Sequence, residues 1–401
     1  MGAMHVFSYI SFLYCATCSL TYEHHSVQQT CGCGSPLLVH YDYQKLRRNW
    51  KRDSLKTRQY NLWRYHELLP ILSDTNIVSF EESMTPLITL NQLGEAFGIK
   101  KLYMKNEVMS PTSTIKARGA SIGVSKAKEL GVNHIILSSN GHAGTAWTQY
   151  ITRANIQSTI VLSNDSPKNI RQKLAISNAN LTYVEGDICT AEQQIIQEIK
   201  ANEQLYNTST FHEPYQLEGI KTIGLEIAEQ LNWEVPDVII CPTGNGGGLI
   251  GIYKAMLELK KTGWIYEDKL PRLVAVQLAE CAPIVQAWEA GKTESSYATA
   301  STNTMAIGIH IPKSFGDFLI LDAIYHTNGC AIEVSEAEIL EELQKITRLE
   351  GMFICPEGAA AFSAAKRLRQ ENWIKKDETV VVLNTGSGME YAIKNEANVL
   401  N

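Results

Sequence analysis

Short runs of β-branched and other apolar residues alternate with amphipathic stretches from about residue 75 onward. Six such runs predict buried strands, at 132–137, 159–162, 181–184, 238–240, 273–276 and 379–383. Between several of them, apolar positions recur at helical spacing in residues 166–177, 190–201 and 219–231. Strands that alternate with helices in this order predict a parallel α/β fold.

Two of the predicted strands run directly into loops rich in glycine. Residues 238–241 lead into Pro242-Thr243-Gly244-Asn245-Gly246-Gly247-Gly248, and residues 380–383 lead into Asn384-Thr385-Gly386-Ser387-Gly388. Ligands of parallel sheets collect at the carboxyl ends of the strands, so both loops are expected to point at one site. Successive glycine amides can form a concave nest around a phosphate, because no side chains stand in the way.

Lys116 lies in the segment Ser110-Pro111-Thr112-Ser113-Thr114-Ile115-Lys116-Ala117-Arg118-Gly119-Ala120. An amine attacks an aldehyde only when it is deprotonated, and an apolar, partly desolvated site favours that state. Ile115 and Ala120 would help to build such a site. Together with the glycine loop, Lys116 indicates a lysine that forms a Schiff base with a phosphate-bearing cofactor.

Composition narrows the class of protein. The chain has 401 residues with 44% hydrophobic content, enough for one large or two medium cores, which excludes disordered and fibrous classes. The net charge of −6 argues against nucleic acid as a partner. The basic window 45–58 is interpreted as a solvated linker or helix face, in preference to a polyanion contact.

Several features predict a cytoplasmic protein. No run of about 18 apolar residues predicts a membrane helix, and Met1–Leu13 lacks the basic start and small-residue cleavage site of a signal peptide. Five of the nine cysteines are scattered in apolar or mixed surroundings, a pattern typical of a reducing cytosol. We therefore expect no membrane partner.

The first four cysteines form two close pairs, Cys15-x-x-Cys18 and Cys31-x-Cys33. Two such pairs on a hairpin-sized loop resemble a zinc ribbon, in which four thiolates close a tetrahedral structural site. The second pair is one residue shorter than the usual knuckle. Two interpretations stay open, a structural zinc site and a cysteine-rich hairpin without an ion.

The segment Lys105–Gly119 resembles the Schiff-base segment of threonine synthases and threonine dehydratases, the fold-type-II pyridoxal-phosphate (PLP) enzymes. Further motifs similar to that family follow in order through nearly the whole chain. They are Thr85-Pro86-Leu87, Ser139-Asn140-Gly141-His142-Ala143-Gly144, Glu218-Gly219-Ile220-Lys221-Thr222-Ile223-Gly224, Pro242–Gly248, Gly351–Ala359 and Thr385–Gly388. The cysteine-rich start, followed by Pro36–Tyr43, resembles the amino-terminal extension of threonine synthases.

The resemblance implies a fold-type-II, tryptophan synthase β-like enzyme with two α/β domains and the cofactor in the cleft between them. Residues 1–43 would form the zinc-ribbon-like extension. The large domain would comprise 44–116 and 218–401, and the small domain 117–217. It also implies a homodimer that acts on a small amino acid.

The resemblance further assigns roles around the cofactor. Lys116 would form the Schiff base and then act as the general base that shuttles the α-proton. Gly244, Asn245, Gly246 and Gly247 would hold the cofactor phosphate through backbone amides, and Thr385 would hydrogen-bond the pyridine nitrogen. His142 occupies the place of the family's asparagine over the ring, whereas a one-residue shift would put Asn140 there.

On the substrate side the chain departs from the threonine synthase pattern. Residues expected to face the substrate are Thr114, Asn140, Gly141, Ala143 and Gln216. Gln216 stands where the family has arginine, Phe211 where it has serine, and Ala143 where it has threonine. A dianionic phosphate needs charge-assisted donors, and loss of a bidentate arginine removes a contact of about 1.5–3 kcal/mol. These changes argue against O-phosphohomoserine as the substrate.

Three hypotheses for the function follow. The leading one is a threonine-synthase-like lyase that performs β- or γ-elimination or replacement on another small amino acid. The second is an authentic threonine synthase that holds the phosphate through residues such as Lys105, His142 or His212. The third is a non-catalytic paralogue, motivated by His142 and by Lys116-Ala117-Arg118, which stands where threonine synthases have Lys-Asp-Arg.

Overall fold

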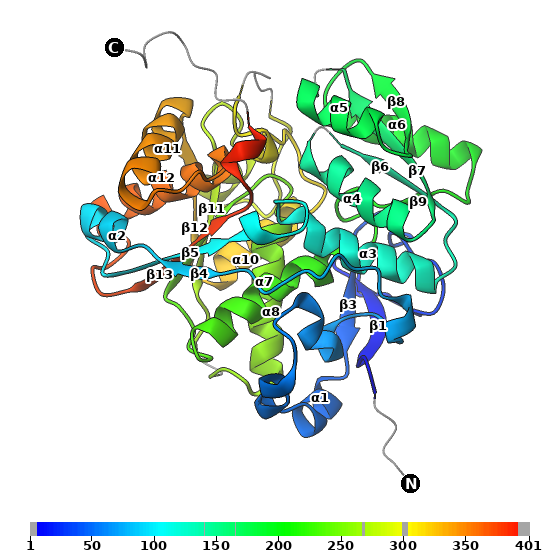
Figure 1. The fold of residues 1–401 in the computed structure, drawn as a ribbon, viewed down its shortest axis with the longest axis horizontal. Coiled ribbons are helices and arrows are strands. Elements are labelled where there is room, and N and C mark those ends of the chain that lie inside the picture. Colours follow the sequence, from blue (N-terminus) through cyan, green and yellow to red (C-terminus); the bar gives the residue numbers. More distant parts are fainter. Residues whose placement is uncertain (1–5, 140, 165, 267–268, 299–303, 392–401) are drawn as a thin grey trace.

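A computed structural model describes residues 6–139, 141–164, 166–266, 269–298 and 304–391. Within them the chain forms three sheets, shown in Figure 1. The strand orders are β2-β1-β3, β12-β11-β10-β13-β5-β4 and β8-β7-β6-β9. The parallel α/β fold class is therefore confirmed, with an additional small sheet at the amino terminus.

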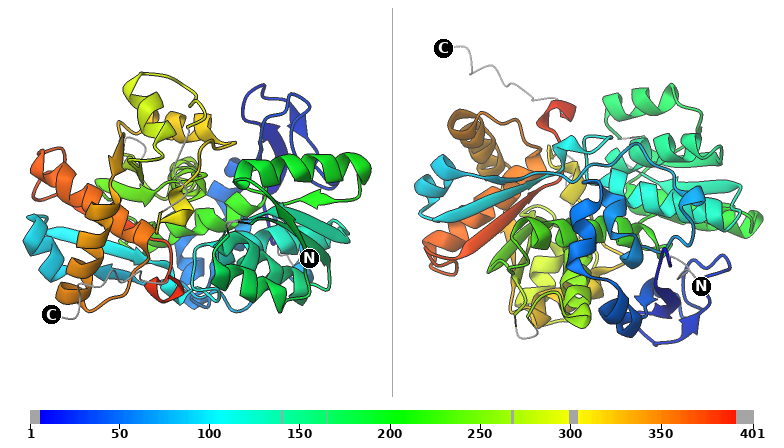
Figure 2. Two further views of the ribbon diagram at one scale, coloured as in Figure 1. Left: turned by 90° about the horizontal axis from the view of Figure 1, so that it is seen from above. Right: turned by 60° about the horizontal axis from the view of Figure 1, so that its bottom comes forward.

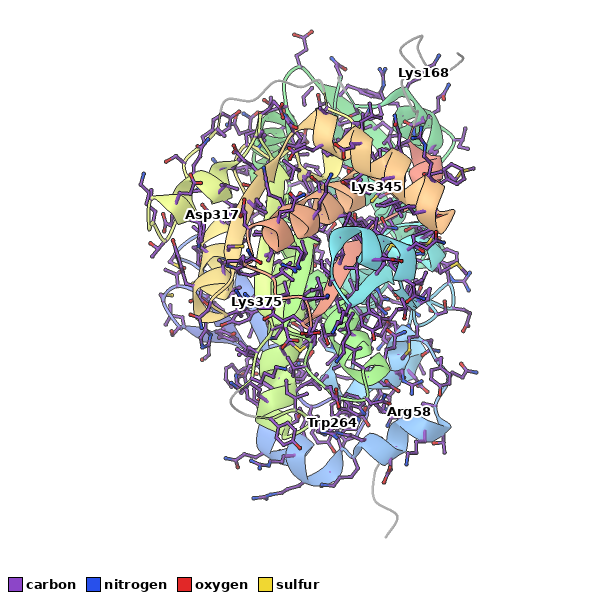
Figure 3. All side chains as sticks on the ribbon, turned by 90° about the vertical axis from the view of Figure 1, so that its left-hand side faces the viewer. Arg58, Lys168, Trp264, Asp317, Lys345 and Lys375 are labelled. Atoms are coloured by element: carbon purple, nitrogen blue, oxygen red, sulfur yellow. The ribbon has the colours of Figure 1, made fainter. Side chains whose placement is uncertain are left out.

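The amino-terminal sheet is antiparallel. Strand β1 (Ile10–Cys15) pairs with β2 (Thr21–Tyr22) and with β3 (Leu37–Tyr41). After it come α1 (Tyr43–Asn49) and the 3-10 segments η1 (Arg52–Thr57), η2 (Leu62–Leu68) and η3 (Asp74–Asn76). Trp50 stacks on Trp264, which is labelled in Figure 3, with 3.9 Å between ring centroids. This stacking fixes the end of α1 to the main body of the protein.

The basic window 45–58 covers α1 and η1. Six of its seven cationic side chains are exposed, and the seventh, Arg58, pairs with Glu67 at 2.6 Å. The window is thus a solvated helix face, as interpreted from the sequence.

The six-stranded sheet is built from two separate parts of the chain. Its strands are β4 (Leu87–Thr89), β5 (Lys101–Asn106), β10 (Val238–Pro242), β11 (Arg272–Leu278), β12 (Cys330–Val334) and β13 (Thr379–Asn384). All neighbours are parallel except β4, which is antiparallel to β5. The associated helices are α2 (Asn91–Phe97), α8 (Gly247–Thr262), α9 (Pro283–Glu289), α10 (Asp317–His326), α11 (Glu336–Glu350) and α12 (Pro356–Gln370), with short turns η4 (Glu107–Met109), η5 (Ile307–Ile309) and η6 (Gly388–Glu390).

The four-stranded sheet lies beside the larger sheet in the views of Figure 2. Its parallel strands are β6 (His134–Ser138), β7 (Gln157–Ser163), β8 (Asn180–Val184) and β9 (Tyr206–Asn207). Helices α4 (His142–Arg153), α5 (Lys168–Ala175) and α6 (Ile188–Ala201) accompany it, while α3 (Lys116–Glu129) and α7 (Gln216–Gln230) connect it to the rest. This sheet falls inside the predicted small domain 117–217, although the domain limits themselves stay a prediction.

Helices α3 and α7 approach each other closely through glycine. A Cβ atom on Gly219 would lie 2.0 Å from the carbonyl oxygen of Arg118, and one on Gly119 would lie 3.2 Å from the carbonyl oxygen of Gln216. Any larger residue at Gly219 would force the two backbones apart. The contact fixes the amino-terminal end of α3, where Lys116 lies, against the start of α7.

A first buried charge cluster joins β5, α3 and α7. Arg118 Nε donates to Glu107 at 2.7 Å and its Nη1 donates to Glu226 at 2.6 Å. Lys105 Nζ also donates to Glu226, at 2.6 Å, and all four charged side chains are at most 2% exposed. Two cations thus face two carboxylates, which is the condition under which charges are tolerated in a protein interior.

A second buried charge cluster ties the amino-terminal sheet to α7 and α8. Lys221 contacts Glu258 at 2.7 Å and Lys254 contacts Glu218 at 3.2 Å. The Tyr41 hydroxyl donates to Glu218 at 2.8 Å, and Lys221 Nζ lies 4.4 Å from the centre of the Tyr41 ring. The extension is therefore held by charge and cation–π contacts as well as by apolar packing.

Candidate active site

The glycine loop between β10 and α8 has the geometry of an anion site. Gly246 caps α8 with a φ of 84°, in the left-handed region where glycine is favoured. A Cβ on Gly246 would lie 2.4 Å from the Ile320 side chain, and one on Gly244 would lie 2.3 Å from the carbonyl oxygen of Gly308. The first amides of α8 have no acceptor within the helix, so they offer donors and a partial positive charge to a phosphate.

Lys116 is the first residue of α3, and its neighbours bring the predicted site segments together. The amide of Ile115 donates to the carbonyl of Thr385 at 2.9 Å, and Thr114 forms a β-bridge with Gly386. A Cβ on Gly248 would lie 3.6 Å from Cδ1 of Ile115. The lysine, the glycine loop and the loop after β13 therefore meet, as the sequence predicts.

The environment of Lys116 favours its neutral amine. The side chain is half-buried, and this burial lowers the pKa of Lys116, while the Glu357 carboxylate acts in the opposite direction. Within the described ranges no side chain or carbonyl accepts a hydrogen bond from Nζ. A lysine with a lowered pKa and an uncommitted amine is suited to nucleophilic attack on an aldehyde.

His142 begins α4, directly after Gly141, the residue that caps this helix. Ser139 Oγ orders the turn by accepting the amide of Gly144 at 2.8 Å. Burial lowers the pKa of His142, so its imidazole is neutral near pH 7, and the ring lies 5.3 Å from the ring of Tyr391. Ala143 follows it in the first turn of α4, whereas Asn140, the alternative to His142, lies outside the described residues.

Thr385 follows β13 and is half-buried. Its carbonyl is held by the Ile115 amide, and its Oγ1 lies 3.4 Å from the Cys355 sulfur. A hydroxyl at this place can hydrogen-bond a ring nitrogen without carrying a charge. Its position beside the Lys116 segment fits the role that the resemblance implies, and that role stays a prediction.

Sequence reasoning assigned no role to three residues of this region, Glu357, Gly308 and Tyr391. The Glu357 carboxylate, only 3% exposed, accepts the amide of Gly308 at 2.8 Å and the hydroxyl of Tyr391 at 2.7 Å. The sequence contains one indication of a role for Glu357, which is the single charged residue in the run Ile354–Ala361. Tyr391 gave no signal.

Two residues predicted to face the substrate are committed to neighbouring groups. Gln216 is 6% exposed, and its Nε2 donates to the carbonyls of Ser209 at 3.2 Å and Thr208 at 3.4 Å. The Thr114 hydroxyl lies 3.3 Å from that of Thr112. The Gln216 amide group is thus used on backbone carbonyls, and substrate contacts of either residue stay predictions.

The four amino-terminal cysteines lie together. All Sγ atoms of Cys15, Cys18, Cys31 and Cys33 lie within 4.8 Å of one another, and two of the pairs are 3.5 Å apart. A zinc tetrahedron with Zn–S bonds of about 2.3 Å has S–S edges of about 3.8 Å. Burial raises the pKa of Cys15, but hydrogen bonds from the amides of Cys18 and Thr17 and from the thiols of Cys18 and Cys31 together outweigh it and lower the pKa to about 6. The arrangement fits a tetrathiolate metal site.

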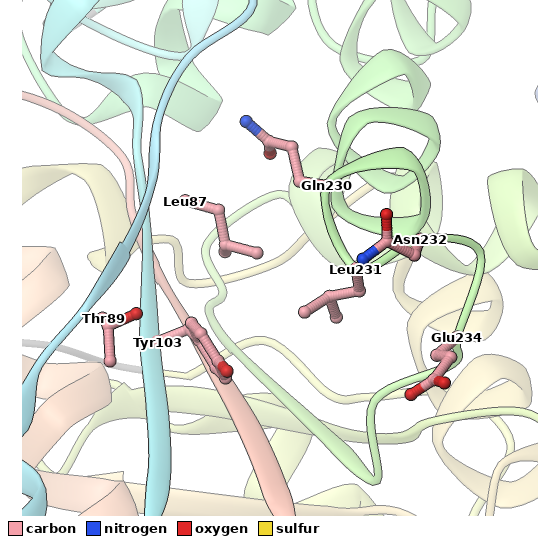
Figure 4. A pocket seen from close by; sticks show the side chains of 7 residues that line it. All are labelled: Leu87, Thr89, Tyr103, Gln230, Leu231, Asn232 and Glu234. Atoms are coloured by element: carbon pink, nitrogen blue, oxygen red, sulfur yellow. The ribbon is translucent and has the colours of Figure 1, made fainter.

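A separate open pocket of about 540 Å³ lies between the edge of the large sheet and the end of α7 (Figure 4). Its lining residues are Leu87, Thr89, Tyr103, Gln230, Leu231, Asn232 and Glu234. None of the predicted site residues lines it, so it is not the site built around Lys116. No helix in the described part of the chain is long and apolar enough to cross a membrane.

Three features suit a phosphate-bearing aldehyde cofactor: the half-buried lysine with a lowered pKa, the glycine loop at the start of a helix, and the hydroxyl of Thr385. Together they indicate an enzyme that binds its cofactor through a lysine. Residues 78–386 match the family described as "Pyridoxal-phosphate dependent enzyme". The chain belongs to this family, which confirms the predicted PLP-dependent lyase and its cofactor.

Named relatives agree with the family. The chain is 35% identical over 379 residues to threonine synthase of Methanocaldococcus jannaschii, covering 94% of this chain and 92% of the relative. It is 34% identical over 377 residues to threonine synthase of Methanosarcina acetivorans, covering 93% and 91%.

Solved structures show the same fold at lower identity. The processed form of threonine deaminase isoform 2 from Solanum lycopersicum matches with a TM-score of 0.64 and 18% identity, covering 76% of this chain and 84% of that one. Maize serine racemase matches with a TM-score of 0.64 and 20% identity, covering 76% and 88%. The predicted fold-type-II architecture is confirmed.

Proposed function

We propose that the protein is a PLP-dependent lyase that performs β- or γ-elimination or replacement on a small amino acid other than O-phosphohomoserine. One contrast supports this proposal. The residues predicted to hold the cofactor are present and meet at one place, whereas Gln216, in the position of the family's arginine, uses its amide donors on backbone carbonyls.

The roles of the chain's own residues follow from their placement. The cofactor, when bound, supplies an electron sink for the bond electrons released at the substrate's α-carbon. Lys116 would hold the cofactor and then move the α-proton, which its lowered pKa favours. The amides of the glycine loop would hold the phosphate, Thr385 would hydrogen-bond the ring nitrogen, and neutral His142 would donate a further hydrogen bond to the cofactor.

An authentic threonine synthase is the second candidate, and the named relatives support it. The basic residues that could replace the missing arginine are not free to bind a phosphate, which argues against this candidate. Lys105 Nζ already donates to Thr85, Glu226 and Gln230, at 2.7, 2.6 and 3.0 Å, so its three protons are used. Burial lowers the pKa of His212, which stacks on Phe315, so this residue offers no charge to a phosphate near pH 7.

Direct turnover tests the proposal. The purified protein, loaded with PLP, is assayed for ammonia, 2-oxoacid or replacement products with L-serine, L-threonine and L-homoserine, and for threonine with O-phosphohomoserine. We expect turnover of at least one unphosphorylated amino acid. Robust threonine formation from O-phosphohomoserine would establish the second candidate instead. A protein that binds PLP through Lys116 yet turns over none of these compounds would contradict the proposed substrate class.

We also propose that the four cysteines hold one structural zinc ion. The four Sγ atoms lie within 4.8 Å of one another, which is close to the spacing in a zinc tetrahedron. A hairpin without an ion would not need its four thiols to converge in this way. Their role would be to close the hairpin that carries β1 to β3. The homodimer and the cytoplasmic location stay predictions.

Metal analysis of the purified protein is expected to give about one zinc per chain. Cys18→Ser is expected to remove the ion and to lower the unfolding midpoint by at least about 5 °C, because metal binding contributes to folding. Cys189→Ser, at a half-buried cysteine outside the cluster, is the matched control and should keep the ion. Protein expressed with added zinc that contains none would refute the zinc site.

A further inference from the structure

Glu357 is a buried carboxylate without a cationic partner among the described residues. It lies in the first turn of α12, and its two oxygens accept hydrogen bonds from neutral groups, the Gly308 amide at 2.8 Å and the Tyr391 hydroxyl at 2.7 Å. The other deeply buried glutamates described above, such as Glu107 and Glu226, are paired with cations. A buried carboxylate without a salt-bridge partner is costly, which makes it a candidate functional group.

Four segments place Glu357 in the Lys116 site. Gly308 belongs to η5, and its carbonyl packs against Gly244 of the glycine loop. Tyr391 follows η6, and its ring faces the ring of His142 at 5.3 Å. The charge of Glu357 raises the pKa of both Lys116 and His142 against the larger effect of burial, so the carboxylate is within electrostatic reach of both.

Tyr391 holds this carboxylate in position. Its hydroxyl binds Glu357 while the preceding residue, Glu390, contacts the small sheet's helix α5 through Asn169, whose Nδ2 donates to the Glu390 carbonyl at 2.9 Å. Residues 390 and 391 therefore connect both parts of the molecule beside the site. The residue that holds the Glu357 carboxylate is thus adjacent in sequence to a contact with α5.

We propose that Glu357 is a specificity-determining residue that favours amino acids with an uncharged leaving group, such as a hydroxyl, over those with a phosphate. A hydroxyl can donate a hydrogen bond to the carboxylate, whereas a phosphate dianion would face a fixed negative charge in a site of low dielectric. This inference rests on the proposed function and deepens it. The missing arginine removes attraction for a phosphate, and Glu357 adds repulsion.

The test compares L-serine with O-phospho-L-serine on the PLP-loaded protein. Binding is measured by the change in the cofactor's visible absorption on titration, so that the readout does not depend on turnover. Glu357→Gln keeps the size of the side chain and removes its charge. We expect the affinity for O-phospho-L-serine relative to L-serine to rise by about tenfold or more in this variant.

Two further variants separate charge from shape. Glu357→Asp retains the charge and is expected to keep the preference for L-serine, while Glu357→Ala removes the charge with a smaller side chain and is expected to act like Glu357→Gln. Glu341→Gln is the matched control, because Glu341 is an exposed residue of α11 that pairs with Lys366. It should leave the ratio unchanged.

A relative affinity that stays within about twofold in both Glu357→Gln and Glu357→Ala would overturn the inference. So would an equal loss of preference in Glu357→Asp. The proposed function fails separately, by absence of turnover with unphosphorylated amino acids in the unaltered protein. The spectroscopic titration still decides the role of Glu357 in that case.

Discussion

Lys116→Ala is expected to remove the absorption band of the Schiff base, leaving at most the spectrum of the free aldehyde, and to reduce turnover by about 10³-fold or more, because one residue holds the cofactor and moves the α-proton. The glycine loop is not altered by this change, so PLP can still bind through its phosphate without the covalent link. Absorption spectra and steady-state rates of the dialysed variant, compared with the unaltered protein, check this expectation.

Lys128→Ala serves as the control for Lys116→Ala. Lys128 is on the same helix, is exposed, and donates to the Thr75 carbonyl at 3.0 Å. Its replacement should leave both spectrum and rate unchanged. If Lys116→Ala retained the absorption band of the unaltered protein, Lys116 would not be the residue that carries the cofactor.

Arg118→Leu is expected to destabilise the fold by about 3–5 kcal/mol, the second large effect. Among the described residues, the change would leave the carboxylates of Glu107 and Glu226, both 0% exposed, with Lys105 as their one cationic partner. Chemical denaturation followed by circular dichroism measures the loss. Because Arg118 is two residues after Lys116 on α3, weaker cofactor binding is expected to accompany it.

A surface ion pair gives the comparison for Arg118→Leu. Lys100 pairs with Asp377 at 2.5 Å, with 58% and 76% of the two side chains exposed. Lys100→Ala should leave the unfolding midpoint unchanged, since exposed pairs contribute little. Equal midpoints for Arg118→Leu and Lys100→Ala would show that the buried cluster is not needed for stability.

Some residues of the sequence motifs form buried contacts in the interior of the protein and do not lie in the candidate site. In the Glu218-Gly219-x-Lys221-Thr222 motif, Glu218 and Lys221 belong to the second buried cluster, and Gly219 permits the close approach of α3 and α7. Thr222 accepts a hydrogen bond from Arg118 at 2.8 Å. The motif can be identified from the sequence, but only the contacts between α7 and α3 show that it helps to position Lys116 at the start of α3.

Among the strands that escaped prediction from the sequence, β5 and β12 did so for a physical reason. The run Lys101–Asn106 forms β5, although three of its six residues are lysine or asparagine. Lys105 is fully buried there because Glu226 neutralises its charge, and that partner is 121 residues away. The strand Cys330–Val334 is short and contains Glu333, so its apolar pattern was weak.

The candidate site was predicted to the extent that it depends on local sequence. Lys116, the glycine loop and Thr385 carry their signal in consecutive residues, and they meet as expected. Glu357 and Tyr391 act through a contact between residues 34 positions apart, and Gly308 reaches Glu357 from 49 positions away. No spacing rule links such residues, so their association required the structure.

The two buried clusters impose a constraint on how this sequence can diverge. Each contains two basic and two acidic side chains, so altering one member leaves an unbalanced charge where water cannot screen it. Among relatives, these eight positions are expected to change together or to remain fixed. Gln216 and Ala143 carry no charge and belong to neither cluster, so their exchange would leave the charge balance of both clusters unchanged. Since both are predicted to face the substrate, substrate preference is expected to change more readily than the frame around Lys116.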